Sequence, residues 1–476
     1  MCTSIAVGHD ASADGSLLVA RNEDCIRASW NKAMIRRPQP EWLAFPNAVA
    51  NGVWTLGNGM RVPVPIASYA YTGMPDAGAA AEASAAIGNR FLFEERGVNS
   101  CDFAISATNS MTTNPAAQAA DPFVGQAGSD EGAGLAESIL PTLLLPQARS
   151  ALHALELLSG YMETVGASEP NGLFVADPSA IWYVEIGSGH HWVAVRVPAG
   201  ACLIVANALR VHGVDLDDTA NVRHSAGLLS FVREHRLLAD ADPHRFDFAA
   251  AFGELGQPYN VDRVWLGQLL LTPSLKQPVR QPQYPLFLAP DRPLGPGDVM
   301  RVLRAGYAGT ALEGIAERPI GWNKTAESHV MVLDGAMPDG LRALIWQCVG
   351  TPLCAPYLPF FSGLEQIPEA YARGDDHYGT DSAYWAYRGL YTLAQTAGQA
   401  DQVATMWLAY QTRLIAQQQS LRSLLTGSDA AEPRAHTGIA HGYCAGTIAA
   451  GLALARATRN RLMTELTGRT SPNQPS

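Results

Sequence analysis

Cys2 is the residue of this 476-residue chain whose position could do chemistry by itself. If Met1 is removed, as happens before a small second residue, the chain begins with a thiol and a free α-amine on one residue. Reference pKa values are about 8.5 for a thiol and about 7.7–8.0 for an α-amine, so the amine can be partly neutral near pH 7 and accept the thiol proton. The pairing predicts nucleophilic catalysis by Cys2, with its α-amine as general base.

The segment RNED, from Arg21 to Asp24, could support such a nucleophile. A cation beside Cys2 favours the thiolate, and a carboxylate can hold the α-amine in position. A surface ion pair at a strand end also explains Arg21 and Asp24. From these residues alone, the surface ion pair is the favoured explanation.

Two histidine-containing segments could suggest a metal site. His190 and His191 are adjacent, and adjacent residues on a strand point to opposite faces, so they rarely bind one ion. His436, His441 and Cys444 lie in HTGIAHGYC, but no matching second pair of ligands is apparent. Since a phosphate-binding GxxxxGK[ST] motif is also missing, we expect no metal and no other cofactor.

The remaining polar or reactive residues have simple explanations. Asp177 and Glu185, around the segment WYVE, could contact a substrate amine, but turn charges explain them more simply. The seven cysteines are an odd, widely spread set without a CxxC pair, so a disulfide scaffold is not expected. Most of them should be small buried apolar side chains.

The first 24 residues predict a β-hairpin. CTSIAVG and LLVARNED are rich in strand-forming residues, and HDASADGS between them is a turn cluster. This hairpin would place Cys2 beside the RNED segment. Further strands are predicted at VPVPIASYAYTG, DFAISATNS, NGLFVADP, IWYVEIGSG, HHWVAVRVP, CLIVANAL, ESHVMVLD and LRALIWQCVG.

Helices are expected before and after the later strands. Residues 114–135 predict an exposed loop, and residues 136–165 have helical periodicity that Pro141 and Pro146 must break or cap. After about residue 365 the pattern becomes helical. Two sets of strands with helices on either side predict a layered α+β or an αββα sandwich architecture, and the pattern does not choose between them.

Composition argues against several classes of partner. The chain has 33 Lys and Arg against 44 Asp and Glu, a formal net charge of −11, and its cations are scattered. Nucleic acid and anionic membrane surfaces are therefore not expected as partners. No stretch reaches the roughly 18 apolar residues of a membrane span, and the N-terminus lacks the features of a signal peptide. We expect a cytoplasmic protein.

The chain resembles the PepD-like dipeptidase family, which also contains the secernins. The resemblance begins with CTSIAVGHDASADGSLLVARNED, which carries the initial Cys-Thr, the A-S-x-D-G-S turn and the A-R-N-E-D segment typical of the family. It continues to about residue 400 through SATNS, EPNGLFVADPSAIWYVEIGSGHHWVAVRVP, VDRVWLGQ, LTPSL, ESHVMVLD and PYLPFFSGLEQIPEAY. The resemblance implies the four-layer αββα fold of N-terminal-nucleophile hydrolases over residues 1–360. A helical extension over residues 361–476 would pack on that core.

The resemblance also implies a set of site residues. Cys2 would be the nucleophile, with Arg21 and Asp24 as the adjacent pair. Asn109 of SATNS falls where the wider superfamily has an oxyanion-hole Asn. The second Asn and the second Arg of that superfamily fall at Asn207 of IVANAL and at Arg263 of VDRVW.

Three functions remain open at this stage. The first is a cysteine-type dipeptidase acting on unblocked dipeptides, which the family resemblance favours. The second is an amidase for N-acyl amino acids or for bile-salt or β-lactam-like amides. The third is a secernin-like regulatory protein without peptidase activity. The expected partner is a small peptide, and a homo-oligomer would suit an intracellular peptidase that must limit access to its site.

Overall fold

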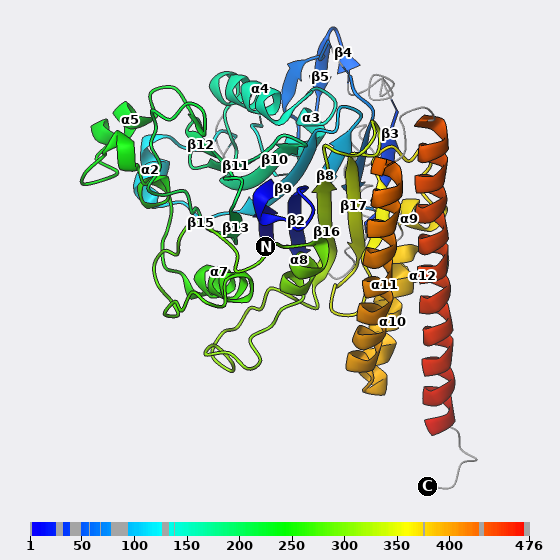
Figure 1. Ribbon diagram of the computed structural model, residues 1–476. Helices are drawn as coiled ribbons and strands as arrows, with labels where there is room; N and C mark the ends of the chain where they lie inside the picture. Colours follow the sequence, from blue (N-terminus) through cyan, green and yellow to red (C-terminus); the bar gives the residue numbers. More distant parts are fainter. Residues whose placement is uncertain are drawn as a thin grey trace.

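Two antiparallel β-sheets flanked by helices form the body of the protein, an α+β fold (Figure 1). The computed structural model describes residues 2–24, 32–38, 49–56, 58–66, 68–77, 94–125, 133–137, 139–374, 377–427 and 433–470, without the side chains of residues 108, 109, 433 and 434. All strand pairs among these residues are antiparallel, as the predicted hairpins require.

The first sheet has seven strands, with the N-terminal strand near its middle. In spatial order they are β15 (Phe287–Leu288), β13 (Cys202–Val205), β1 (Cys2–Val7), β2 (Leu17–Asp24), β16 (Thr325–Leu333), β17 (Ala343–Val349) and β18 (Leu358–Phe361). The predicted N-terminal hairpin is confirmed as β1 and β2. It pairs Cys2 with Glu23 and Ser4 with Arg21. Because side chains alternate along a strand, these four residues share one face of the sheet.

The second sheet has eight strands and packs against that face. In spatial order they are β14 (Val222–His224), β12 (Trp192–Arg196), β11 (Ala180–Ile186), β10 (Asn171–Asp177), β9 (Ala104–Ser110), β8 (Glu94–Asn99), β7 (Tyr71–Pro75) and β3 (Ile35–Arg37). A small third sheet contains β4 (Val49–Ala50), β5 (Val53–Thr55) and β6 (Arg61–Pro63).

One strand prediction needs correction. VPVPIASYAYTG, expected as one strand, contributes to β6 and to β7 in different sheets, because Pro63 and Pro65 cannot donate to a sheet ladder. The strand predicted at CLIVANAL is confirmed as β13, in the first sheet. It pairs with β1, with Ser4 opposite Val205, so the chain crosses between the two sheets at this point.

The helices agree with the predicted pattern except near residue 115. There the expected loop contains a short helix that Asn114 caps and Pro115 begins. The predicted interruption of residues 136–165 is confirmed, since Pro141 lies in the first turn of α3 and Pro146 follows its end. The helices are α2 (Pro115–Ala120), α3 (Leu140–Leu144), α4 (Ala151–Thr164), α5 (Leu228–Glu234), α6 (Phe248–Phe252), α7 (Pro258–Leu271), α8 (Pro296–Leu303), α9 (Glu369–Ala372), α10 (Ala383–Ala397), α11 (Ala400–Gly427) and α12 (Pro433–Arg469).

Helices contact both sheets, and the alternation of side chains divides the core. On β10, Leu173 and Val175 belong to a hydrophobic cluster with α3 and α4. Phe174 and Ala176, on the other face of the same strand, belong to the cluster that includes the seven-stranded sheet. On that sheet, α7 contacts β13, and α8 contacts β2 and β16.

Of the C-terminal helices, α10 contacts β17 and α12 contacts β18, while α11 packs against α8, α10 and α12 (Figure 1). Among the described residues, one helix, Ala435–Arg469 of α12, is long and apolar enough to cross a membrane, with a mean hydropathy of 1.3 in its most apolar window. The sequence search missed it because glycines, histidines and threonines interrupt the apolar run. A single such helix is weak evidence for a span. The predicted boundary between residues 360 and 361 stays a prediction.

Candidate active site

Cys2 begins β1, and its side chain is buried. Its backbone N–H donates to Oδ1 of Asn207 over 2.9 Å. Asn207 reaches this position because β13 pairs with β1 in antiparallel direction, with Val205 opposite Ser4. The residues that follow β13 therefore lie beside the first residue of β1. The same oxygen accepts a bond from Arg263, and since both partners are donors only, the shared atom must be the amide oxygen.

Arg21 contacts the sulfur of Cys2. Its Nη2 lies 3.0 Å from Sγ, because Arg21 is on β2, two residues before the cross-strand partner of Cys2. A fully buried guanidinium at this distance stabilises a thiolate electrostatically. The structure therefore brings together the cation and the thiol that the sequence placed on one hairpin.

Two carboxylates that sequence analysis missed bind Arg21. Glu95, on β8, accepts from Nη1 over 2.9 Å, and Glu137, just before α3, accepts from Nη2 over 3.2 Å. Burial acts to lower the pKa of Arg21, but the nearby thiol and carboxylates outweigh it and hold that pKa well above its usual value. The Arg21 side chain thus stays charged and fixed in orientation. No local sequence signal identifies either Glu, because both come from the far sheet or its connections.

Beside this group, Lys32 forms a buried charge cluster with Glu23, Asp76 and Glu95. Its Nζ lies 2.9 Å, 2.7 Å and 3.7 Å from their carboxylate oxygens, respectively. The three acids lie close enough together to hold a metal ion. The Lys32 ammonium lies where a metal ion would have to bind. Burial acts to lower the pKa of Lys32, but the neighbouring carboxylates outweigh it and raise that pKa, so the side chain stays charged. The donor set therefore fits a lysine and not a metal.

Arg263 approaches Cys2 from α7. Its Nη1 donates to the Cys2 carbonyl over 2.6 Å and to Oγ1 of Thr3 over 3.0 Å, and its Nη2 donates to Oδ1 of Asn207 over 2.9 Å. Burial, with the nearby Arg318, lowers the pKa of Arg263 to about 10. The predicted residues Asn207 and Arg263 thus both lie at Cys2, where they hold its backbone.

Asp24 lies on the other face of β2 from Arg21 and Glu23, as strand alternation requires. Its carboxylate accepts hydrogen bonds from Arg318 and Thr325. Arg21 and Asp24, expected to act as an adjacent pair, therefore have different partners on opposite faces of β2. Glu95 and Glu137 bind Arg21, and Arg318 binds Asp24.

Asn109 lies near the end of β9, opposite Gly172 of β10. Its side chain is outside the described part of the chain, so its expected oxyanion-hole role stays a prediction. The next residue, Ser110, accepts a bond at its carbonyl from Nδ2 of Asn207 over 2.9 Å and donates from Oγ to Glu137 over 2.8 Å. The end of β9 therefore lies at the group around Cys2.

Ser106, His329 and Glu327 form an arrangement that resembles a hydrolytic triad. His329 Nε2 lies 2.9 Å from Ser106 Oγ, and its Nδ1 lies 2.9 Å from Glu327 Oε1. All three side chains are buried between the two sheets, with at most 1% exposure. The network joins β9 to β16 across the space between the two sheets, which is a structural role.

Asp177 makes a turn contact, as the simpler explanation predicted, whereas Glu185 does not. Asp177 Oδ1 accepts the N–H of Ser179 over 2.8 Å, which is a turn contact. Glu185 is not a turn charge. It is fully buried and accepts the N–H of Val211 over 3.0 Å. Burial raises its pKa to about 7.

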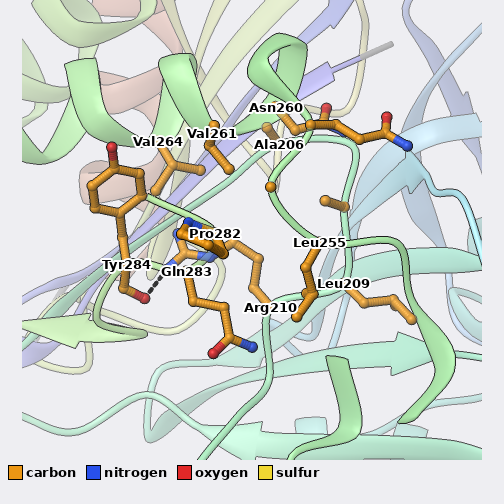
Figure 2. Close-up of a pocket in the computed structure, with 13 residues that line it drawn as sticks. Ala206, Leu209, Arg210, Leu255, Asn260, Val261, Val264, Pro282, Gln283 and Tyr284 are labelled. Atoms are coloured by element: carbon orange, nitrogen blue, oxygen red, sulfur yellow. Dashed lines mark hydrogen bonds between the residues drawn. The ribbon is translucent and has the colours of Figure 1, made fainter. Parts of the chain in front are cut away.

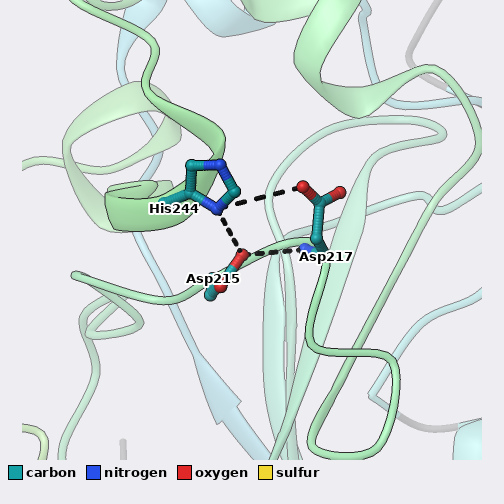
Figure 3. Close-up of side chains that lie close together, drawn as sticks. All are labelled: Asp215, Asp217 and His244. Atoms are coloured by element: carbon teal, nitrogen blue, oxygen red, sulfur yellow. Dashed lines mark hydrogen bonds and ion pairs between the residues drawn. The ribbon is translucent and has the colours of Figure 1, made fainter.

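The adjacent histidines have separate partners, in agreement with the prediction. His190 Nδ1 lies 2.9 Å from Asp121, and His191 Nδ1 lies 2.9 Å from Ser225. Figure 3 shows a different group, His244 with Asp215 and Asp217, on the surface. His244 Nδ1 lies 3.2 Å and 3.9 Å from the two carboxylates. These are exposed ion pairs, and acidic groups of this kind are common without a metal.

The pocket in Figure 2 is lined in part by Ala206 and Ala208, the chain neighbours of Asn207, and it does not suit a peptide. It is lined by α7 residues such as Asn260 and Val264 and by Tyr284, and Asn260 donates to the Asn207 carbonyl over 3.0 Å. Its volume is about 20 Å³, compared with at least roughly 300 Å³ for a small-ligand pocket. This cavity has room for a water molecule.

Most of the described thiols are buried, as predicted. Burial raises the pKa of Cys202, Cys354 and Cys444 to about 12 each, which makes them poor nucleophiles near neutral pH. At Cys2, Arg21 contacts the sulfur. Cys25 lies outside the described residues.

Comparison with known proteins connects this site to a family. The model of Peptidase family C69 matches residues 1–407. A probable dipeptidase of Salmonella dublin is 33% identical over 392 residues, covering 79% of this chain and 83% of that protein. One of Latilactobacillus sakei is 30% identical over 407 residues, covering 83% and 81%. Among solved structures, a C2A mutant of a conjugated bile acid hydrolase from Clostridium perfringens matches 72% of this chain and 88% of its own, with 12% identity and a TM-score of 0.36.

Proposed function

Because the chain belongs to peptidase family C69, we propose that it is a cysteine-type dipeptidase that hydrolyses unblocked dipeptides, with Cys2 as its nucleophile. One pair of contacts carries the proposal. The sulfur of Cys2 lies 3.0 Å from Arg21 Nη2, and its nitrogen lies 2.9 Å from Asn207 Oδ1. Relatives of similar length are named as probable dipeptidases, which favours a dipeptide over other amides.

The proposed reaction begins after Met1 is removed, when the nitrogen of Cys2 is a free α-amine. The amine accepts the thiol proton, and Sγ attacks the peptide carbonyl carbon to form a tetrahedral oxyanion. When this intermediate collapses, the C–N bond breaks and the ammonium proton moves to the leaving amine. Water then attacks the thioester, which releases the first amino acid and regenerates the thiol.

Each neighbour of Cys2 has a distinct role in this scheme. Arg21 stabilises the thiolate before attack. Asn207 and Arg263 orient the α-amine and the backbone of Cys2, which makes them positioning residues. Asn109 would donate to the oxyanion, as the family resemblance implies. Asp24 and Arg318 would act on the site through Arg263, because the charges of both influence its pKa.

The proposal extends to the architecture and the setting of the protein. We take the two sheets, with α3 and α4 against one and α7 and α8 against the other, as the αββα sandwich of N-terminal-nucleophile hydrolases. Residues 361–476 would be an extension packed on that core. The proposed location is the cytoplasm, and the proposed partners are small peptides and further copies of the chain, without nucleic acid or membrane.

Intact mass and hydrolysis of the purified protein test the function together. The expected mass lacks Met1, and the protein cleaves unblocked dipeptides but not N-acyl amino acids or bile-salt amides. Cys2→Ala abolishes cleavage, and Cys444→Ala, at a buried thiol outside the site, does not. Retained Met1 in an active enzyme would refute the α-amine as base. Cleavage of N-acyl amino acids alone would replace the dipeptidase with an amidase.

A further inference from the structure

We propose that Glu137 binds the free α-ammonium group of the substrate and thereby selects unblocked dipeptides. The inference rests on the proposed function and adds a residue that recognises the substrate. Glu137 is separated from Cys2 by 135 positions in the sequence. The two residues meet only because Arg21 lies between their side chains.

The first argument is proximity to the sulfur. Nη2 of Arg21 lies 3.0 Å from Sγ of Cys2 and 3.2 Å from Oε1 of Glu137. A single nitrogen atom therefore contacts both the nucleophile and this carboxylate. Any group that approaches Sγ for reaction comes close to the negative charge of Glu137.

The second argument is the covalent geometry of a dipeptide. Its α-nitrogen is two bonds from the carbonyl carbon under attack, a separation of roughly 2.5 Å. In a reactive complex that carbon lies about 3–3.5 Å from the sulfur. The α-ammonium must therefore bind beside the nucleophile, within the short range that Glu137 occupies.

The third argument is access. The Glu95 side chain, which binds the other end of Arg21, is 2% exposed, whereas that of Glu137 is 21% exposed. Both carboxylates help to hold the guanidinium, but only Glu137 of this pair faces solvent. Of the two carboxylates, Glu137 is therefore the one that a ligand from solvent meets first.

The fourth argument is that Glu137 is held in place. Ser110 Oγ donates to its Oε2 over 2.8 Å, and its backbone N–H donates to Oε1 of Glu169 over 2.6 Å. The bonds to Arg21 and Ser110 fix the orientation of this carboxylate, and its negative charge is what an ammonium group would recognise. An N-acylated substrate lacks the positive charge and would desolvate this carboxylate without compensation.

The test compares two charge-neutral variants, Glu137→Gln and Glu95→Gln. The kcat/KM is measured for Ala-Ala and for N-acetyl-Ala-Ala, and the ratio of the two values reports recognition of the free amine. Because both substrates use the same nucleophile, an altered thiol reactivity cancels in this ratio. Glu137→Gln is expected to lower the ratio about tenfold or more, whereas Glu95→Gln, which also removes a partner of Arg21, leaves it within about twofold of wild type.

Several outcomes would overturn the inference. One is an unchanged ratio in Glu137→Gln, which leaves the dipeptidase proposal intact. If Glu95→Gln lowers the ratio of kcat/KM values as much as Glu137→Gln does, the effect of Glu137 is an indirect one through Arg21. A wild-type preference for N-acetyl-Ala-Ala would refute both the function and the inference. If Glu137→Gln does not fold, Ser110→Ala takes its place, because it removes the bond that orients the carboxylate, and it should lower the same ratio.

If the wild-type protein cleaves neither substrate, the proposed function fails, and binding then decides the inference. Calorimetric titration of Ala-Ala into Cys2→Ala, with and without Glu137→Gln, measures recognition without catalysis. Binding that weakens about tenfold on loss of the carboxylate would support the ammonium site. Equal or undetectable binding in both proteins would overturn it.

Discussion

Arg263 and Asn207 hold the backbone of Cys2 through one shared atom. Oδ1 of Asn207 accepts from Arg263 Nη2 over 2.9 Å and from the Cys2 nitrogen over 2.9 Å, while Arg263 Nη1 also binds the Cys2 carbonyl. The backbone of Cys2 is thus held at both its nitrogen and its oxygen. Because a nucleophile and its base must keep a fixed geometry, this arrangement links α7 and the end of β13 to the chemistry.

The shared atom predicts non-additive effects of mutation. Asn207→Ala and Arg263→Gln should each lower kcat/KM by about 10²-fold. The first change removes the acceptor of the Cys2 nitrogen, and the second removes the bond that holds this acceptor in place. The double variant should lose little more than the worse single variant, with a coupling energy of at least about 1 kcal/mol. Steady-state kinetics measures the cycle, and Arg280→Gln, at a partly exposed Arg, is the control. Additive effects would show that the two side chains act independently.

Arg21→Lys is expected to impair the enzyme although it keeps the positive charge. A guanidinium contacts Sγ, Glu95 and Glu137 at once, and a single ammonium cannot reproduce that fork. We expect kcat/KM to fall by about 10²-fold or more. Alkylation of Cys2 by iodoacetamide at pH 7 should slow in parallel. Unchanged alkylation alongside lost activity would place the role of Arg21 in substrate binding.

Ser106→Ala should leave activity within about twofold of wild type, because the buried network of Ser106, His329 and Glu327 is structural. Removal of the hydroxyl leaves a buried histidine nitrogen without its partner, so the free energy of unfolding should fall by about 1–3 kcal/mol. Urea denaturation and dipeptide hydrolysis measure the two effects. A loss of activity as large as that of Cys2→Ala would instead identify a second catalytic group.

Asp102→Asn is expected to change how stability depends on pH. Burial raises the pKa of Asp102 to about 6, although Arg342 acts in the opposite direction. The folded state therefore keeps a proton that the unfolded state loses, and the free energy of unfolding falls as pH rises from about 4 to about 6. Asn tolerates the positive φ of 58° at this position.

The variant should lack this slope. Its stability relative to wild type should therefore improve by up to about 2 kcal/mol between pH 4 and pH 8. Urea denaturation at several pH values measures the difference. An unchanged difference across this range would show that Asp102 titrates alike in the folded and unfolded states.

Residues 2–24 determine much of the site by local sequence. The turn cluster between two strand-forming segments predicted β1 and β2, and β2 spans Leu17–Asp24 as LLVARNED suggested. A short antiparallel hairpin fixes which residues are neighbours, so the closeness of Cys2 and Arg21 followed from the sequence. The family resemblance added Asn207 and Arg263, and both lie at Cys2.

Tertiary structure decided which charges surround Arg21. Strand alternation turns Asp24 to the opposite face, where Arg318 binds it, although RNED had suggested a pair with Arg21. Glu95 and Glu137 reach Arg21 from 74 and 116 positions away. Such contacts depend on how the two sheets pack, and no local periodicity encodes them. The sequence by itself therefore predicted Cys2 and its neighbouring cation, whereas packing of the second sheet supplied the carboxylates that hold this cation in place.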